Sequence, residues 1–203
     1  MKKSETAQHI IKEFDNKEEF ELNLVEASVH PIGAVGLWNS MIKIIKMAKE
    51  KGDDIIVICE DDHYFTENYS PKLLFKEVTE AYIQGAEVLS GGIGGFGQAI
   101  PAGYHRYKVD WFWCTQFIVV YNRFFDKMLD YSFQDTDTAD GVISKLATNK
   151  MVIYPFISEQ KDFGYSDVTQ SGASAGVGLK FNINKYWAID VEARGAIAPS
   201  IFG

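Results

Sequence analysis

Three adjacent carboxylates, Glu60, Asp61 and Asp62, directly follow five apolar residues that run from Ile55 to Cys59. Adjacent carboxylates repel one another, which costs stability unless a cation or hydrogen-bond donors offset the repulsion. Hard divalent cations such as Mg2+ and Mn2+ take carboxylate oxygens and keep coordination positions open for phosphate oxygens. The cluster therefore predicts a metal site for a phosphate-bearing ligand. The alternative is a set of acids that simply ends a strand in a solvated loop.

The apolar run predicts the strand that must position these acids. An unbroken apolar run bounded by acids on both sides is typical of a central strand buried on both faces, as in a parallel sheet. In open α/β sheets, ligands bind beyond the carboxyl ends of the strands, which is where the three acids lie. Expected helices lie near residues 9–20, 38–51, 70–84, 122–130 and 138–148, and expected strands near 21–25, 55–59, 86–90, 111–121 and 151–157. This alternation predicts an α/β fold with a mostly parallel sheet flanked by helices.

The composition changes near the carboxyl end of the chain. Apolar and polar residues alternate over 177–183 and again over 187–193. A period of two predicts an antiparallel β-hairpin, and residues 172–203 resemble a hairpin from an outer-membrane barrel. We therefore expect a first domain of residues 1–169 and a β-hairpin tail of unrelated character at 170–203.

Charge and cysteine usage narrow the class of protein. A net charge of -8 and a pI near 5.0 argue against nucleic acid, because binding through counterion release needs clustered Lys and Arg, which are scattered here. Cys59 and Cys114 show no metal-ligand or redox spacing, and Cys59 is expected to be a buried free thiol in a reducing compartment. The first 14 residues hold no apolar stretch long enough for a signal peptide or a membrane span. We expect a cytoplasmic location without a transmembrane helix, which leaves peripheral membrane contact open.

Four motifs occur in a characteristic order. The first is Gly-Ala-Val-Gly-Leu-Trp-Asn-Ser at 33–40, followed after a helix by the second, Ile-Val-Ile-Cys-Glu-Asp-Asp at 56–62. The third is the acidic stretch Thr-Asp-Thr-Ala-Asp-Gly-Val-Ile-Ser at 136–144, and the fourth runs from Tyr154-Pro155 through Gln160 to Ser166-Asp167. Together they resemble the pattern of glycosyltransferase family 25 over most of the chain.

The resemblance implies a GT-A fold, which is Rossmann-like, and a hexosyltransferase activity. It implies a nucleotide-sugar donor, with a UDP-sugar as the first choice, and Mn2+ or Mg2+ held by the acidic motif through the diphosphate. Asp62 then becomes the principal metal ligand, Glu60 a second ligand of the metal or the nucleotide, and Asp61 a hydrogen-bond partner of the ribose. Gly36 and Ser40 carry over as donor-binding residues of the first motif. The acceptor would be a saccharide, in the synthesis of surface polysaccharide or lipopolysaccharide.

An acceptor hydroxyl also needs a base. Asp140 and Asp137 are the candidates, because they stand at the start of a predicted helix whose dipole keeps a carboxylate ionised. The alternative is helix capping, by Thr136 or Asp137.

Four further residues are candidates for acceptor binding, namely His63, Gln160, Trp111 and Trp113. His63 either contacts the metal or acceptor or makes a local hydrogen bond beside the acids. The two indole rings either stack on a sugar or enter the core. The glycine-rich segment 90–97 lacks the Lys-Ser/Thr ending of a P-loop, so we expect a mobile loop near the donor.

The chain also departs from the family. Members begin with a strand that supports the nucleotide base, and that strand is absent here, while the ending after Asp167 is replaced by the predicted hairpin. Each buried backbone group left unpaired would cost roughly 1 to 3 kcal/mol, unless the hairpin supplies replacement pairing. Two alternatives therefore stand beside an active enzyme. One is a degenerate glycosyltransferase domain that binds a nucleotide or a partner without turnover, and the other is a membrane or assembly protein whose functional part is the hairpin.

Overall fold

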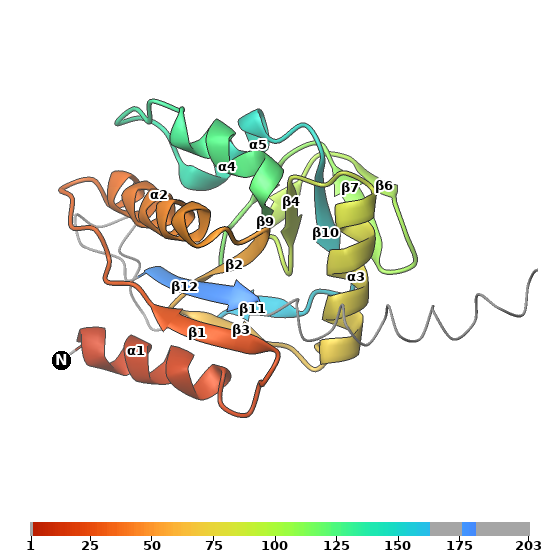
Figure 1. Ribbon diagram of the computed structural model, residues 1–203, viewed down its shortest axis with the longest axis horizontal. Helices are drawn as coiled ribbons and strands as arrows, with labels where there is room; N and C mark the ends of the chain where they lie inside the picture. Colours follow the sequence, from red (N-terminus) through yellow and green to blue (C-terminus); the bar gives the residue numbers. More distant parts are fainter. Residues whose placement is uncertain (1, 163–175, 182–203) are drawn as a thin grey trace, which may run out of the picture.

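The computed structural model describes residues 2–162 and 176–181 of the chain, and Figure 1 shows their arrangement. The helices of this part are α1 (Lys2–Glu13), α2 (Gly33–Lys51), α3 (Pro71–Ile83), α4 (Asn122–Leu129) and α5 (Ala139–Leu146). The strands are β1 (Phe20–Leu24), β2 (Ile55–Glu60), β3 (His63–Phe65), β4 (Val88–Ser90), β5 (Gly95–Phe96), β6 (Ala99–Pro101), β7 (Arg106–Val109), β8 (Phe112–Trp113), β9 (Phe117–Tyr121), β10 (Lys150–Ile153), β11 (Ser158–Gln160) and β12 (Gly176–Phe181).

The main sheet is mixed. Its strand order is β1-β12-β2-β9-β4-β10-β7-β6, and within the described residues only the pair of β4 and β10 is parallel. The predicted α/β architecture is confirmed, whereas the predicted mostly parallel pairing is not, since most neighbouring strands are antiparallel. The reason is physical: an apolar run shows that both faces of a strand are buried, but it does not report the direction of the neighbouring strands.

β12 occupies a position inside this sheet. It lies between β1 and β2 and pairs antiparallel with both, so that Gly176 is opposite Glu60 and Phe181 is opposite Phe20. Residues from the predicted hairpin therefore supply backbone pairing for the strand that leads to the acidic motif. The second half of that hairpin, near 187–193, lies outside the described residues.

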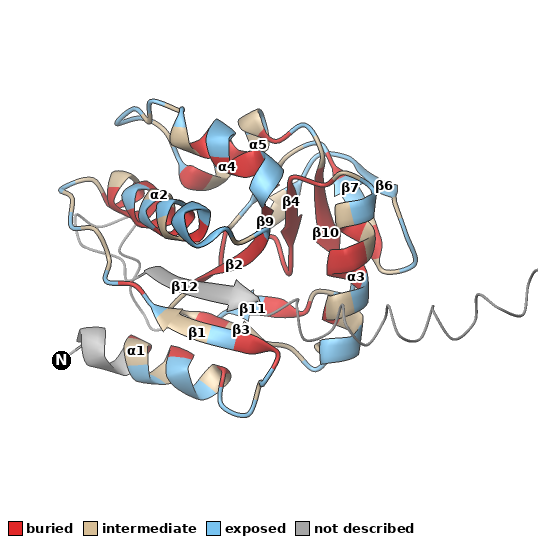
Figure 2. Cartoon of the chain, in the orientation of Figure 1, coloured by how far each residue is buried: buried red, intermediate tan, exposed pale blue. Residues whose placement is uncertain are grey.

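Helices cover both faces of the sheet, as Figure 1 shows. Alternate residues of the central strands enter two separate cores, and Figure 2 shows that these strands are buried along their length. In β2, Ile56 and Ile58 face the first core, while Ile55, Val57 and Cys59 face the second. Cys59 is the buried free thiol that the sequence predicts.

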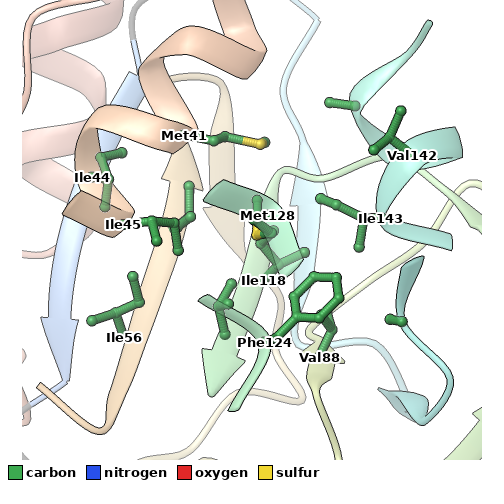
Figure 3. Packing of buried hydrophobic residues seen from close by; sticks show 14 of the residues in the cluster. Met41, Ile44, Ile45, Ile56, Val88, Ile118, Phe124, Met128, Val142 and Ile143 are labelled. Carbon is green, nitrogen blue, oxygen red and sulfur yellow. The ribbon is translucent and has the colours of Figure 1, made fainter. Parts of the chain in front are cut away.

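The first core joins α2, α4 and α5 to the sheet. Figure 3 shows the packing of its side chains, which include Met41, Ile44 and Ile45 from α2, Phe124 and Met128 from α4, and Val142 and Ile143 from α5. The second core lies under α1 and α3, with Ile10, Phe14, Leu74, Val78 and Ala81. The sheet is thus fixed between two helical layers, which makes its strand ends a rigid frame for a site.

Two predicted elements differ from the structure. The helix expected at 9–20 begins at Lys2 and ends at Glu13, before Asn16, whose φ of 62° is a left-handed conformation incompatible with continuing the helix. The single strand expected at 111–121 is divided into β8 and β9, because Cys114 has a φ of 76° and turns the chain between them. That turn brings the residues on either side of Cys114 to the edge of the sheet near the acids.

Candidate functional site

The carboxyl ends of three strands meet at one edge of the sheet. β2 and β4 both pair antiparallel with β9, and β4 pairs parallel with β10, so β2, β4 and β10 run in the same direction. The acidic motif follows β2 and the glycine-rich segment follows β4. The acids therefore lie at the strand ends that the sequence predicts, even though the sheet is mixed.

Glu60 is the last residue of β2 and is half-buried. Its Oε1 accepts a hydrogen bond of 2.6 Å from the hydroxyl of Thr115. The pKa of Glu60 is raised to about 8, mainly by burial and then by the charge of Asp62; Asp61 and Asp140 add smaller contributions, and the hydrogen bond from Thr115 opposes the rise. The four carboxylates thus act on one another and form one electrostatic cluster.

The hydrogen bonding of Asp62 is incomplete within the described part of the chain. Its Oδ2 accepts from Nε2 of Gln160 at 3.3 Å, and its carbonyl accepts from the backbone N–H of Lys161 at 2.7 Å. Its Oδ1 is buried and has no hydrogen-bond partner among the described residues. The pKa of Asp62 is raised to about 6, mainly by burial and then by the charge of Asp61, while hydrogen bonds from its own backbone and from Gln160 oppose the rise. An oxygen in this condition needs a proton or a cation.

Asp140 lies in the first turn of α5 and is tied to the turn at Cys114. Its Oδ2 accepts from the backbone N–H of Cys114 at 3.1 Å, and its Oδ1 accepts from that of Gly141 at 2.8 Å. The N-cap of α5 is Thr138, whose hydroxyl accepts from the Gly141 N–H, so neither Thr136 nor Asp137 fills the capping position that the sequence suggests. Asp140 therefore stands next to the acidic motif as a separate group rather than as the cap of its own helix.

Asp137 is placed differently from Asp140. Its Oδ2 accepts from the hydroxyl of Tyr131 at 3.1 Å and from the backbone N–H of Gln134 at 2.8 Å. These bonds hold the loop between α4 and α5. The arrangement assigns Asp137 a local structural contact and gives no geometric support to its candidacy as a base.

Gly36 and Ser40 support the loop that precedes α2. A side chain at Gly36 would place its Cβ 2.8 Å from the carbonyl oxygen of Ser28, which is closer than packing allows. The Ser40 hydroxyl donates to the Gly36 carbonyl and accepts from the Ser28 N–H, both at 2.9 Å. Ser40 is buried, and its hydroxyl is occupied by these two bonds. The two residues therefore shape the loop after β1. Any effect of theirs on a nucleotide-sugar ligand would be indirect, through the shape of that loop.

His63 points into the second core. Its side chain is 0% exposed, its Nδ1 lies 2.7 Å from the hydroxyl of Ser158, and its ring lies among those of Phe14, Phe65 and Phe117. Burial lowers the pKa of His63 to about 3, and the positive charges of neighbouring basic groups add to this, so the ring is neutral. Of the two readings of His63, the structure supports the local hydrogen bond and not contact with an acceptor.

The two indole rings do not enter the core. Trp113 is 59% exposed and Trp111 is half-buried, whereas Phe112 between them is buried. Their ring centroids lie 5.1 Å apart with the planes tilted by 46°. Trp113 is therefore open to a ligand, and Trp111 is partly open.

The glycine-rich segment is packed, at least where it leaves β4. The Gly91 carbonyl accepts from the N–H groups of Ile157 and Ser158. A Cβ at Gly92 would lie 2.0 Å from the Ser158 carbonyl oxygen, so this position has room only for hydrogen. The glycines therefore allow the segment after β10 to cross close above β4, which places β11 and Gln160 beside the acids.

Sequence reasoning missed Thr115 and Cys114. Thr115 is buried and holds Glu60, and the backbone of Cys114 holds Asp140. The sequence does hold a signal for them, because the polar pair Thr115 and Gln116 directly precedes a fully apolar strand. The acidic motif stands in the same relation to the apolar strand that it follows.

The donor set fits a divalent cation that takes one or two protein oxygens. Among residues 6–162, no group of three or more His, Cys, Asp or Glu side chains converges as a complete metal site. The buried Oδ1 of Asp62 nevertheless has no hydrogen-bond donor among residues 2–162, and the charge of Asp62 raises the pKa of Glu60. A cation bound here would draw its other ligands from a phosphate-bearing molecule or from water.

The chain matches no protein-family model and no curated protein. In the described part of the chain, no helix combines the length and the apolar character needed to cross a membrane.

Proposed function

We propose that the chain is a metal-dependent glycosyltransferase with a GT-A-like fold, which moves a sugar from a nucleotide-sugar donor to a saccharide acceptor. The observation that carries the proposal is the state of Asp62 and Glu60. Both have raised pKa values, and Asp62 keeps a buried oxygen without a hydrogen-bond donor in the part of the chain that the structure describes. A divalent cation would offset this gathered negative charge and could also bind the oxygens of a diphosphate, whereas acids that merely end a strand in solvent would not need a cation.

Asp62 would hold Mn2+ or Mg2+ through Oδ1, and Glu60, fixed by Thr115, would assist. When bound, the cation supplies neutralisation of the negative charge that grows on the departing nucleoside diphosphate. Asp61 is adjacent to both acids and would accept a hydrogen bond from the ribose. The pairing of Gln160 with Asp62 fixes the carboxylate orientation that this role requires.

Asp140 is the candidate base for the acceptor hydroxyl. Its two oxygens each accept one backbone N–H, which fixes the carboxylate and leaves a further lone pair on each oxygen. Asp140 bonds to Cys114 and Glu60 bonds to the next residue, Thr115, so the candidate base lies near Glu60. In this role Asp140 takes the hydroxyl proton as the acceptor oxygen attacks the donor sugar.

The test is Mn2+-dependent transfer from a panel of UDP-sugars to a panel of saccharides. Asp62→Asn keeps the shape of the side chain and removes its charge, and we expect turnover to fall by about a hundredfold or more. Asp135→Asn, an equally small change at an exposed aspartate, is the matched control and should leave turnover unchanged. Turnover that survives Asp62→Asn would exclude the metal role of Asp62.

A degenerate domain that binds the nucleotide without turnover is the second candidate. The position of β12 favours it, because the place beside β2 is filled by an antiparallel strand from the far end of the chain. In this candidate, β12 supplies backbone pairing for β2, and the site binds the nucleotide without turning it over. Calorimetry with UDP and Mn2+ separates the two candidates, since binding without any transfer fits only the degenerate domain.

A further inference from the structure

The residues around β8 form an exposed aromatic surface beside the candidate base. Trp113 is 59% exposed, and its ring lies over Gly95 of the paired strand β5, where an added Cβ would meet Trp113 Cε3 at 3.1 Å. Trp111 lies in the same way against Gly97, where an added Cβ would stand 2.5 Å from its Nε1. Gly95 thus lies against the ring of Trp113 and Gly97 against the Nε1 edge of Trp111, and a larger residue at either position would displace a ring.

This surface is held in place by α5. The hydroxyl of Ser144 accepts from the Phe112 N–H at 3.0 Å and donates to the Phe112 carbonyl at 3.1 Å. Directly after Trp113, the N–H of Cys114 donates to Asp140. Trp113 directly precedes Cys114, whose backbone N–H holds the candidate base Asp140. A ligand on the indole of Trp113 would therefore lie near this base.

A carboxylate lies at the edge of the same surface. Asp110 is exposed, and its Oδ1 accepts from the backbone N–H groups of Gly97, Gln98 and Trp111 at 2.8 to 3.2 Å. These bonds lower the pKa of Asp110, with the Gln98 N–H as the first cause, so the group is ionised near neutral pH. Its other oxygen, Oδ2, stands on the Gly97 side of the loop, 2.6 Å from where a Cβ would be. The carboxylate is therefore fixed by one oxygen and presents acceptor lone pairs with the other.

We propose that Trp111, Trp113 and Asp110 form a subsite for a neutral pyranose, which is the acceptor sugar. A pyranose has a face of C–H groups that packs on an indole, and hydroxyl groups at its rim that donate to a carboxylate. An ionised Asp110 repels a uronic acid or another anionic sugar, which makes the subsite selective for neutral sugars. The acceptor role of the bound sugar rests on the proposed function, whereas saccharide binding itself does not depend on turnover.

The test uses ligand-observed saturation-transfer NMR on the full chain, without donor or metal. The probes are lactose, cellobiose, maltose and chitobiose as neutral saccharides and galacturonic acid as the anionic one. We expect at least one neutral probe to bind with the strongest transfer to the C–H protons of one ring face. Trp113→Ala should weaken this binding by about tenfold or more, while Trp113→Phe keeps an aromatic face and should stay within about threefold.

Matched variants make the result specific. Tyr104→Ala removes an exposed aromatic ring from the turn at the opposite end of the β6–β7 hairpin and should leave binding unchanged. Asp110→Asn should raise the affinity for galacturonic acid relative to lactose. The absence of binding by every neutral probe would overturn the subsite, as would equal binding to Trp113→Ala and to the unaltered chain.

Calorimetry with UDP and Mn2+ on the same variants separates this inference from the proposed function. Trp113→Ala should retain nucleotide binding. If UDP binds and a sugar is transferred from a UDP-sugar, while the indoles do not affect saccharide binding, the subsite is wrong and the proposed function stands. If saccharides bind through the indoles but no nucleotide binds, the subsite stands and the proposed function fails.

Discussion

Gln160 donates a hydrogen bond from Nε2 to Oδ2 of Asp62 at 3.3 Å, although the two residues are 98 positions apart in the chain. The bond exists because β11 pairs antiparallel with β3, which places Gln160 opposite His63, the neighbour of Asp62. It ties the segment after β10 to the acid that follows β2, and it is one of the contacts that lower the pKa of Asp62.

Removing this donor should make cation binding more sensitive to pH. Gln160→Leu takes away a bond that favours the ionised carboxylate, so the pKa of Asp62 should rise above about 6. Mn2+ binding in the presence of UDP should then weaken by about two- to fivefold near pH 6.5, and by much less at pH 8.5 where Asp62 is ionised in either protein. Calorimetry over this pH range measures the difference. Gln134→Leu removes an exposed amide that bonds to the Ser132 carbonyl and is the control; an equal loss at all pH values in Gln160→Leu would contradict the mechanism.

Glu60 should make the metal-free protein less stable as the pH rises. The folded chain holds the Glu60 pKa at about 8, above the ordinary value of 4.5, so the folded state binds this proton more tightly than the unfolded state does. The contribution of Glu60 is therefore most favourable below pH 4.5 and is lost as the pH rises toward 8. Glu60→Gln keeps a partner for Thr115 and removes the charge, so its melting temperature should exceed that of the unaltered chain by about 5 °C at pH 8, with little difference at pH 5.

Thermal unfolding with chelator at pH 5, 6, 7 and 8 measures this effect. Glu67→Gln, at an exposed glutamate, should reproduce the pH dependence of the unaltered chain. Mn2+ with UDP should remove part of the advantage of Glu60→Gln, because a bound cation offsets the same charge. A melting temperature of Glu60→Gln that stays parallel to that of the unaltered chain at every pH would show that Glu60 does not carry the raised pKa.

The loop after β1 should depend on Gly36 and Ser40 for stability. Gly36→Ala forces a Cβ against the backbone oxygen of Ser28, and Ser40→Ala leaves the partly buried Ser28 N–H and the Gly36 carbonyl without that hydroxyl. Each change should lower the free energy of unfolding by about 1 to 3 kcal/mol. Denaturant unfolding measures the loss, and Asn39→Ala, at an exposed position of the same helix, is the control. A direct donor contact would instead reduce UDP affinity without reducing stability.

The sequence predicts most of what lies close together along the chain. The buried β2 followed by acids, the Ser70-Pro71 start of α3 and the Gly52 end of α2 are local patterns, and the structure confirms them: the Ser70 hydroxyl accepts from the Leu73 N–H, and Gly52 adopts a φ of 73°. Such signals depend on a few neighbouring residues, so that a single sequence is enough to read them.

Relations between distant segments were not predictable in the same way. The direction of β9 relative to β2, and the entry of β12 between β1 and β2, depend on pairings over long separations that no local pattern encodes. At the site, Thr115 and the left-handed turn at Cys114 interrupt what reads as one continuous strand. The direction of side chains was equally hard to predict. His63 directly follows Asp62 in the chain, yet its side chain points into the second core.

A buried ion pair links α3 to β7 away from the site. Arg106 and Glu77 are both 0% exposed and are in direct contact, while Glu80 adds a second, partly exposed partner at 3.4 Å. One oxygen of Glu77 and the Nε of Arg106 have no hydrogen-bond partner among the described residues. Arg106→Met would leave the Glu77 charge buried without its cation, and we expect a loss of about 3 to 5 kcal/mol in the free energy of unfolding.

The companion variants show whether this loss comes from the unpaired charge. Arg106→Met combined with Glu77→Leu removes both charges and fills the space with apolar atoms, so stability should return to within about 1 to 2 kcal/mol of the unaltered chain. Lys76→Met breaks an exposed pair with Glu80 on the same helix and should change stability by less than about 0.5 kcal/mol. Urea unfolding of the four proteins measures these differences. A double variant as unstable as Arg106→Met would mean that the pair stabilises α3 against the sheet through its own hydrogen bonds rather than by mutual neutralisation.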